Sequence, residues 1–218
     1  MENSEKLLII DEIEVEYQKL FNECKPKHEK VKAGLDEGLN ILSSLKQSPL
    51  DEIDEKIKES IEKLISPIIL IAQNKVKRIY VTSLIVLQKI ISNSLITKDL
   101  SSSIIQSLGQ ISEDSSEEFV HQKIVETLYP LIDINIIELK EEIIEIIIKI
   151  ILKVFQVKGT SFKESLTILI DKLLSMVCDY ITGELNPIIQ EKKENFIKME
   201  TELKNEENII TSENNIST

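Results

Sequence analysis

The chain has 218 residues, of which 42% are hydrophobic and 29% are charged, and these proportions are typical of a soluble globular protein. Its formal net charge of -12 argues against a general nucleic-acid binder, because phosphate contacts need a basic face. Two cysteines are too few for a disulfide scaffold. We find neither a secretory signal nor an apolar stretch that could cross a bilayer, and we therefore expect a cytosolic protein.

Apolar residues at helical spacing predict a first helix from about Ser4 to Cys24. Pro26 suits the first turn of a second helix. This second helix carries Gly34 and Gly38 one turn apart, and small residues at that spacing let another helix approach closely.

Three further helices are predicted in the middle of the chain. Asp51 is placed to cap the first of them, and Pro67 should bend or end it. The second, from Lys75 to Ile91, has the spacing of a buried helix. The third is short and stops near Gly109. An acid- and serine-rich loop then leads into a helix over about 117–129, which we expect a proline at position 130 to close.

The stretch from Glu138 to Phe155 is the most apolar of the predicted helices. From Glu142 onward, charged residues recur every three or four positions and form one narrow stripe: Glu142, Glu145, Lys149 and Lys153. The rest of its surface is apolar, so we expect protein to cover it on three sides, as in the inner helices of a solenoid. The central helix of an ordinary bundle is the alternative interpretation.

The last part of the chain becomes steadily more polar. Gly159 should end the apolar helix, and Thr160 or Ser161 should cap the next one. After Pro187 the sequence predicts a charged helix with few apolar anchors, and from about Asn205 a disordered polar tail. The predicted division is a helical domain over 1–185, a charged helix over 186–204 and a tail over 205–218.

In total, the sequence predicts an all-α fold of about eight or nine helices joined by short loops. The spacing between helix pairs is irregular, so we expect an armadillo- or HEAT-like stack, an α-solenoid without a regular repeat.

Residues that could support catalysis are scarce. Five glycines cannot supply a P-loop or a dinucleotide fingerprint, and neither motif is found. His28 lies four residues after Cys24, but without a second cluster this pair does not predict a zinc site. Cys178 lies beside core positions of its helix, which argues against a Cys-His catalytic pair. We therefore expect no enzyme, metal or cofactor, although a polar pocket around Cys178 or His121 would reverse this interpretation.

Two basic clusters stand out against the acidic background. Their members are Lys25, Lys27, Lys30 and Lys32 in the first, and Lys75, Lys77 and Arg78 in the second. Solvent-facing charge that aids solubility is one explanation. The functional alternative is a contact for an acidic partner or an anionic membrane, worth about 1 kcal/mol per charge near the membrane surface.

Three segments in order resemble a known family. The run FNECKPKHEKVKAGLDEGLNIL (21–42) joins an acidic residue and Cys24 to a basic run and a small-residue helix. The second segment, KVKRIYVTSLIVLQKIISNSLIT (75–97), has a basic start and an amphipathic helix. The third (149–177) is a long apolar helix, a short loop and a helix with a bulky apolar end. Together they resemble the dimerisation and cyclophilin-binding (DCB) domain of the Golgi trafficking protein MON-two and the large Arf exchange factors of the BIG group.

The resemblance implies an α-solenoid that associates with itself or with neighbouring domains on the cytosolic face of Golgi and endosomal membranes. It implies no catalytic residue, because the domain has none. The family normally continues into a homology-upstream-of-catalysis region and, in the exchange factors, a Sec-seven catalytic module. We find neither, and we expect no nucleotide exchange from an excised domain or short relative.

The sequence therefore predicts a non-catalytic scaffold of Golgi–endosome vesicle trafficking. Its expected partners are proteins, including a second copy of itself or other domains of the family, with peripheral contact to an anionic Golgi membrane and no nucleic acid. Two alternatives stay open: the regulatory N-terminal segment of a catalytically active Arf exchange factor, and an unrelated helical adaptor.

Overall fold

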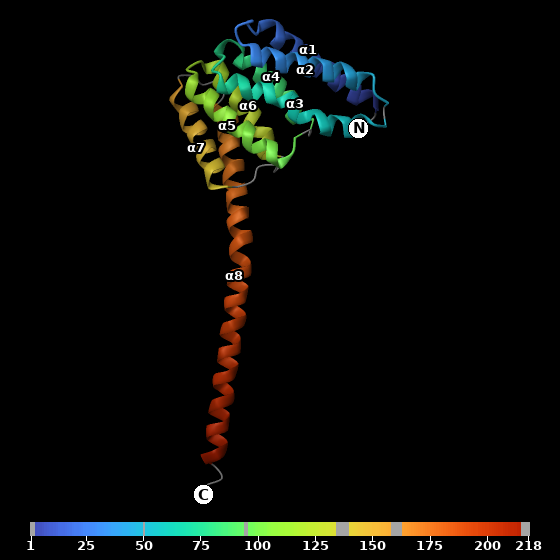
Figure 1. The fold of residues 1–218 in the computed structure, drawn as a ribbon. Helices are drawn as coiled ribbons and strands as arrows, with labels where there is room; N and C mark the ends of the chain where they lie inside the picture. Colours follow the sequence, from blue (N-terminus) through green and yellow to red (C-terminus); the bar gives the residue numbers. More distant parts are fainter. Residues whose placement is uncertain (1–2, 50, 94–95, 134–139, 158–162, 215–218) are drawn as a thin grey trace. The chain divides into compact units, whose positions relative to one another are not determined.

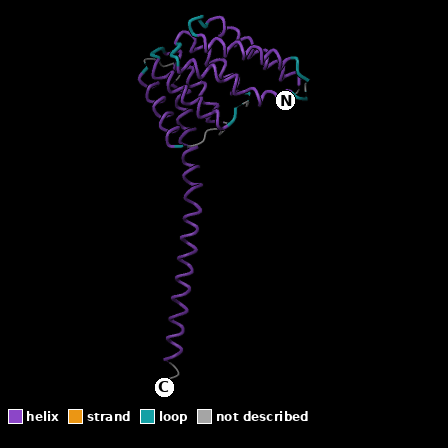
Figure 2. The backbone as a smooth tube through the Cα atoms, in the orientation of Figure 1, coloured by secondary structure: helices purple, strands orange, loops and turns teal. Residues whose placement is uncertain are grey.

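A computed structural model describes residues 3–49, 51–93, 96–133, 140–157 and 163–214, and all regular structure within these ranges is helical (Figures 1 and 2). The predicted all-α fold is confirmed, with eight α-helices and one 3-10 helix in the described residues. Their bounds are α1 Asn3–Glu23, α2 Glu29–Lys46, α3 Ile53–Gln73, η1 Lys77–Ile79, α4 Tyr80–Ser92, α5 Lys98–Asp114, α6 Glu118–Asp133, α7 Glu141–Gln156 and α8 Lys163–Asn214.

The chain divides into two compact units, residues 1–173 and 174–218. In the first unit the helices stack in two layers (Figure 1). α1 packs on α4 and α4 on α6 in one layer, while α3 packs on α5 and α5 on α7 in the other. α2 packs on both α1 and α3, and α3·α4 and α5·α6 contacts join the layers. Each helix pair thus contacts the next pair along the chain, which is the arrangement of an α-solenoid.

The predicted close approach at the glycines of α2 is confirmed. A Cβ atom at Gly38 would lie 2.5 Å from the ring of Tyr17 on α1, and one at Gly34 would lie 3.2 Å from Pro67 on α3. Tyr17 is fully buried, and its hydroxyl donates a hydrogen bond of 2.7 Å to the carbonyl oxygen of Leu64 on α3. α2 therefore approaches both neighbours closely because it has no side chain at positions 34 and 38.

The helix ends predicted at Gly109 and Pro130 are wrong, and Pro67, predicted to bend or end its helix, does not end it. Pro67 and Pro130 lie inside α3 and α6, and α5 continues through Gly109. A proline leaves the carbonyl four residues earlier without its helical donor. At Pro67 that carbonyl belongs to Lys63. Burial of the proline ring against Gly34 then keeps the helix continuous.

Two helix starts also differ from the sequence prediction. Pro26 lies in a turn, and α2 begins at Glu29. The helix expected from Lys75 begins at Tyr80, after η1. Both differences lengthen the loops at one end of the stack. α7 ends at Gln156, and the predicted stop and caps over 159–161 lie outside the described residues.

α8 is continuous from Lys163 to Asn214 and includes Pro187. Its first residues belong to the first unit, where Leu166, Leu169 and Leu173 are buried. The two predicted boundaries, at 185 and 204, fall inside this helix. The division of the chain at those positions stays a prediction.

Candidate interaction sites

The two basic clusters meet at one end of the stack. The loop between α1 and α2 and the segment between α3 and α4 line a common pocket of about 190 Å³. Its lining residues are Glu23, Lys25, Lys27, His28, Lys75, Val76, Lys77, Arg78 and Ile79. We call this the basic pocket. Five of its lining side chains are cationic and one is a carboxylate, in a chain whose overall charge is strongly negative.

The end of α3 fixes Lys75 at the rim of the basic pocket. The amide of Lys75 donates to the carbonyl of Ala72, and the amide of Val76 to that of Ile71, both at 3.1 Å. These two bonds form a Schellman motif, in which the residue at the position of Lys75 is left-handed and is usually glycine. Lys75 has φ = 52°. The fold therefore tolerates backbone strain at a position that carries a long cationic side chain and not a glycine.

Acidic groups border the basic pocket on two sides. Asp114, at the end of α5, lies 3.3 Å from Lys77 Nζ and 3.8 Å from Lys75 Nζ, and it accepts a hydrogen bond from the Tyr80 hydroxyl. Desolvation alone would raise the pKa of Asp114, but the hydrogen bonds from Tyr80 and Lys77 and the two lysine charges lower it overall. Glu23 accepts a hydrogen bond from Thr82. Lys75 and Lys77 are thus partly neutralised.

The remaining two residues of the predicted patch lie on α2, outside the pocket lining. Lys30 is exposed. Lys32 donates to the carbonyl of Cys24 at 3.3 Å, and its Nζ lies 4.5 Å from the centre of the Phe21 ring. Lys32 therefore serves to hold the end of α1 against α2.

α7 presents a second candidate site. Ile147, Ile150 and Val154 are buried, as expected. The opposite flank carries the large apolar side chains Ile148, Leu152 and Phe155, which are 45%, 56% and 59% exposed. We call these three residues the α7 strip.

The expectation that protein covers α7 on three sides is therefore wrong for the described residues. α7 is the last helix of its layer, and its main contact among the described helices is with α5. Apolar periodicity alone does not distinguish a covered face from an open one. The predicted charged stripe is confirmed, and Glu145 and Lys149 form an ion pair of 2.8 Å along it.

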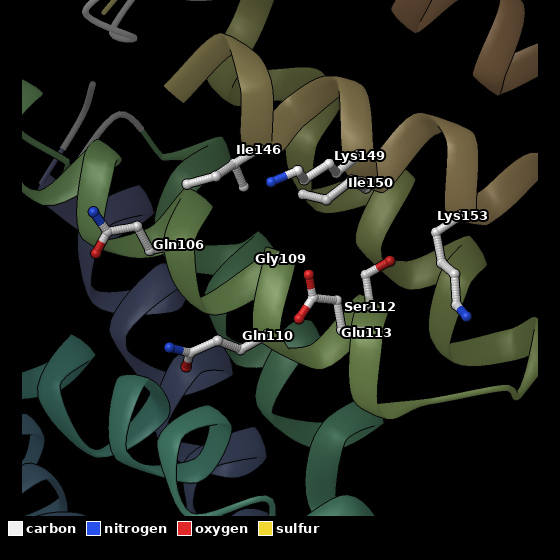
Figure 3. Close-up of a pocket in the computed structure, with 9 residues that line it drawn as sticks. All are labelled: Gln106, Gly109, Gln110, Ser112, Glu113, Ile146, Lys149, Ile150 and Lys153. Carbon is white, nitrogen blue, oxygen red and sulfur yellow. The ribbon is translucent and has the colours of Figure 1, made fainter. Parts of the chain in front are cut away.

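The third candidate site is a pocket of about 270 Å³ between α5 and α7 (Figure 3). Gln106, Gly109, Gln110, Ser112 and Glu113 line it from α5, and Ile146, Lys149, Ile150 and Lys153 from α7. A Cβ atom at Gly109 would lie 2.9 Å from Ile146, so this glycine sets the spacing of the two helices. The lining combines amide, carboxylate and amine groups without a grouping that would activate a nucleophile. No local sequence pattern predicts this pocket, because its two sides come from separate helices.

Comparison with known proteins places the chain in a family. The family described as Mon2/Sec7/BIG1-like, dimerisation and cyclophilin-binding domain matches residues 3–158, well over half of the chain. The chain belongs to this family. Helices α1 to α7, and with them the basic pocket and the α7 strip, fall within the matched residues. No curated protein matches the chain.

Within this DCB domain, the residues that could have indicated catalysis have structural surroundings. His121 is fully buried, and its Nε2 lies 3.1 Å from the carbonyl oxygen of Ser115. Its Nδ1 has no hydrogen-bond partner among the described residues. Desolvation lowers the pKa of His121, the hydrogen bond to Ser115 opposes this, and the charge of Lys153 adds to it. A neutral ring that bonds a backbone carbonyl holds the start of α6 to the preceding loop.

The cysteines do not form a site either. Cys24 is buried, and desolvation raises the pKa of its thiol, partly offset by Lys32. Cys178 is exposed on α8. In the described part of the chain, no cluster of three or more potential metal ligands is found. None of the helices described is both long and apolar enough to cross a bilayer.

Proposed function

We propose that this protein is a non-catalytic scaffold of vesicle trafficking between Golgi and endosomes, which acts by self-association and by binding partner proteins. The family description supports this, since it names dimerisation and cyclophilin binding as the properties of the domain and Mon2, Sec7 and BIG1 as relatives. The single observation that carries self-association is the α7 strip.

The α7 strip places three large apolar side chains on one face of the helix, and their exposure to water is unfavourable. Ile148, Leu152 and Phe155 follow one another at intervals of four and three residues, the spacing of a helix-packing seam. Such a strip, rimmed by charged residues, is typical of an interface centre. The α7 strip also lies inside the residues that match a dimerisation domain, whereas the exposed apolar residues of α8 lie outside them.

The charges beside the strip favour a second copy as the occupant. Glu142 and Glu145 lie in the first half of α7, and Lys149 and Lys153 in the second half. When two α7 helices pack antiparallel, the acidic half of one copy faces the basic half of the other. The surface is thus complementary to itself, as the two-fold symmetry of a homodimer requires. The two strips then form the apolar centre, and the charges form its rim.

The test is the solution mass of the full chain by light scattering over a wide concentration range. The wild type is expected to form a concentration-dependent dimer. Leu152→Asp is expected to be a monomer, because it buries an unpaired charge at the centre of the contact. Leu185→Asp, at a 48% exposed position on α8, is the matched control and should leave the dimer intact. A monomeric control together with a dimeric Leu152→Asp would place the contact on α8 and overturn the assignment to α7.

The interpretation as a regulatory segment of an active Arf exchange factor predicts the same surfaces for residues 3–158. The two differ only in whether a catalytic module is joined to the domain. No feature of the described residues favours this second candidate.

A further inference from the structure

We propose that the basic pocket binds the phosphate monoester of a lipid headgroup, and so docks this end of the stack on an anionic membrane. The inference does not depend on self-association, because the pocket and the α7 strip share no residue. It rests on the α1–α2 loop and the segment between α3 and α4, which are far apart in the sequence and line the same pocket.

Positive charge is concentrated around the basic pocket. Lys25, Lys27 and Arg78 are exposed, line the same pocket, and form no ion pair with any described acidic residue. Lys75 and Lys77 add two further ammonium groups, which Asp114 offsets in part. A surplus of cations around one concavity, in a chain of net charge -12, selects a compact and strongly negative ligand.

Two of the pocket's lysines are held at its rim, Lys75 by its backbone and Lys77 by its side chain. The Schellman motif fixes the backbone of Lys75 in the left-handed region, and Lys77 is tied to α5 by a hydrogen bond of 2.6 Å to the carbonyl of Asp114. A ligand that meets groups already in position loses less entropy on binding. Glycine at position 75 would relieve the backbone strain, so the lysine side chain is better explained by what it binds than by the fold.

The hydrogen-bond donors of the basic pocket match the chemistry of a phosphate monoester. A phosphate monoester carries a charge between about -1.5 and -2 at neutral pH and has three acceptor oxygens. Arg78 offers a planar fork for two of them, while the lysines act as point charges. His28, just before α2, makes no side-chain hydrogen bond to the first turn of that helix. The amides there stay available to an anion.

The position of the basic pocket favours a ligand that is part of a membrane surface. The ends of α1, α3 and α5 and the starts of α2, α4 and α6 lie at this end of the stack, as the bond from Lys77 to Asp114 and the lining residues show. A pocket of about 190 Å³ at loop tips holds a headgroup phosphate while the surrounding lysines touch neighbouring lipids. A buried cleft would instead favour a freely diffusing ligand.

The experiment measures binding of the full chain to vesicles by flotation. One set contains phosphatidylcholine with a few per cent of a phosphatidylinositol monophosphate, and the other contains phosphatidylserine at equal total charge. We expect tighter binding to the first set. The Lys27→Ala/Arg78→Ala variant is expected to lose about thirtyfold in affinity, as two contacts near a membrane surface imply.

The matched control is Lys58→Ala/Lys63→Ala. It removes the same charge from exposed positions of α3 that do not line the pocket, and should change binding by no more than about twofold. Circular dichroism confirms that both variants are folded. Equal binding to both vesicle sets, or equal losses in both variants, would mean diffuse attraction without a site and would overturn the proposal.

A soluble inositol phosphate distinguishes the two sources of the phosphate. Competition with vesicle binding supports the pocket as the site. Tight binding of the soluble compound to a protein that ignores every vesicle would overturn the membrane assignment.

Discussion

Replacing Gly38 by alanine should destabilise the domain strongly, because a new Cβ atom would overlap the ring of Tyr17. The Cβ atom would lie 2.5 Å from one ring carbon and 2.7 Å from the hydroxyl oxygen. Forcing such an overlap in a packed core costs about 1–3 kcal/mol. Displacing the ring also breaks the hydrogen bond to the Leu64 carbonyl, at about 1–3 kcal/mol for buried groups left unpaired. Alanine returns about 1 kcal/mol of helix propensity.

The net expectation is a loss of about 1–5 kcal/mol in the free energy of unfolding. For a unit of this size, the melting temperature should fall by about 2–20 °C. Urea unfolding followed by circular dichroism measures the loss. Gly34→Ala is the matched control, because its Cβ atom would lie 3.2 Å from Pro67, where a small shift suffices, and it should change stability by less than about 1 kcal/mol. If Gly38→Ala is as stable as Gly34→Ala, the packing of α1 against α2 described above is wrong.

Three further predictions follow from single residues. Lys75→Gly should raise the free energy of unfolding by about 0.5–1 kcal/mol, since glycine relieves the backbone strain at φ = 52°. The same variant should bind vesicles more weakly. A lower stability in urea would show that the backbone at position 75 is not strained. Leu166→Asp should abolish cooperative unfolding, because it buries an unpaired charge at a 2% exposed position; a cooperative thermal melt would show that the register of α8 is wrong. The pKa of His121 is lowered in the folded state, so the unfolded state binds the proton first and stability should fall as the pH drops below 6.5. Urea midpoints on either side of that pH should differ less in His121→Gln, and an equal difference would exclude His121 as the cause.

The sequence was sufficient for the existence of the helices and for the spacing of their apolar residues, because both are local properties. The glycines of α2 also identified a close helix contact correctly. The prolines at positions 67 and 130 do not end their helices, because whether a proline ends a helix depends on what packs against its ring. Pro67 is stabilised by Gly34, thirty-three positions earlier, and no local pattern contains that information.

The candidate sites were less predictable than the fold. Lys27 and Arg78 belong to clusters that the sequence shows separately, and only the pairing of the α1–α2 and α3–α4 loops brings them to one pocket. Asp114, which offsets part of that charge, was not foreseen at all. On α7, the sequence identified the charged stripe but gave no means of knowing that Leu152 lies at the open end of a layer.

Charge complementarity between two α7 helices is the central claim, and the mass of mixed variants tests it most directly. One variant carries Lys149→Glu and Lys153→Glu, and the other carries Glu142→Lys and Glu145→Lys. By light scattering, each alone should be a monomer, because like charges then face each other across the antiparallel contact. An equimolar mixture should regain the dimer mass of the wild type. A wild type that stays monomeric at every concentration, or variants that dimerise alone as well as they do when mixed, would contradict the account.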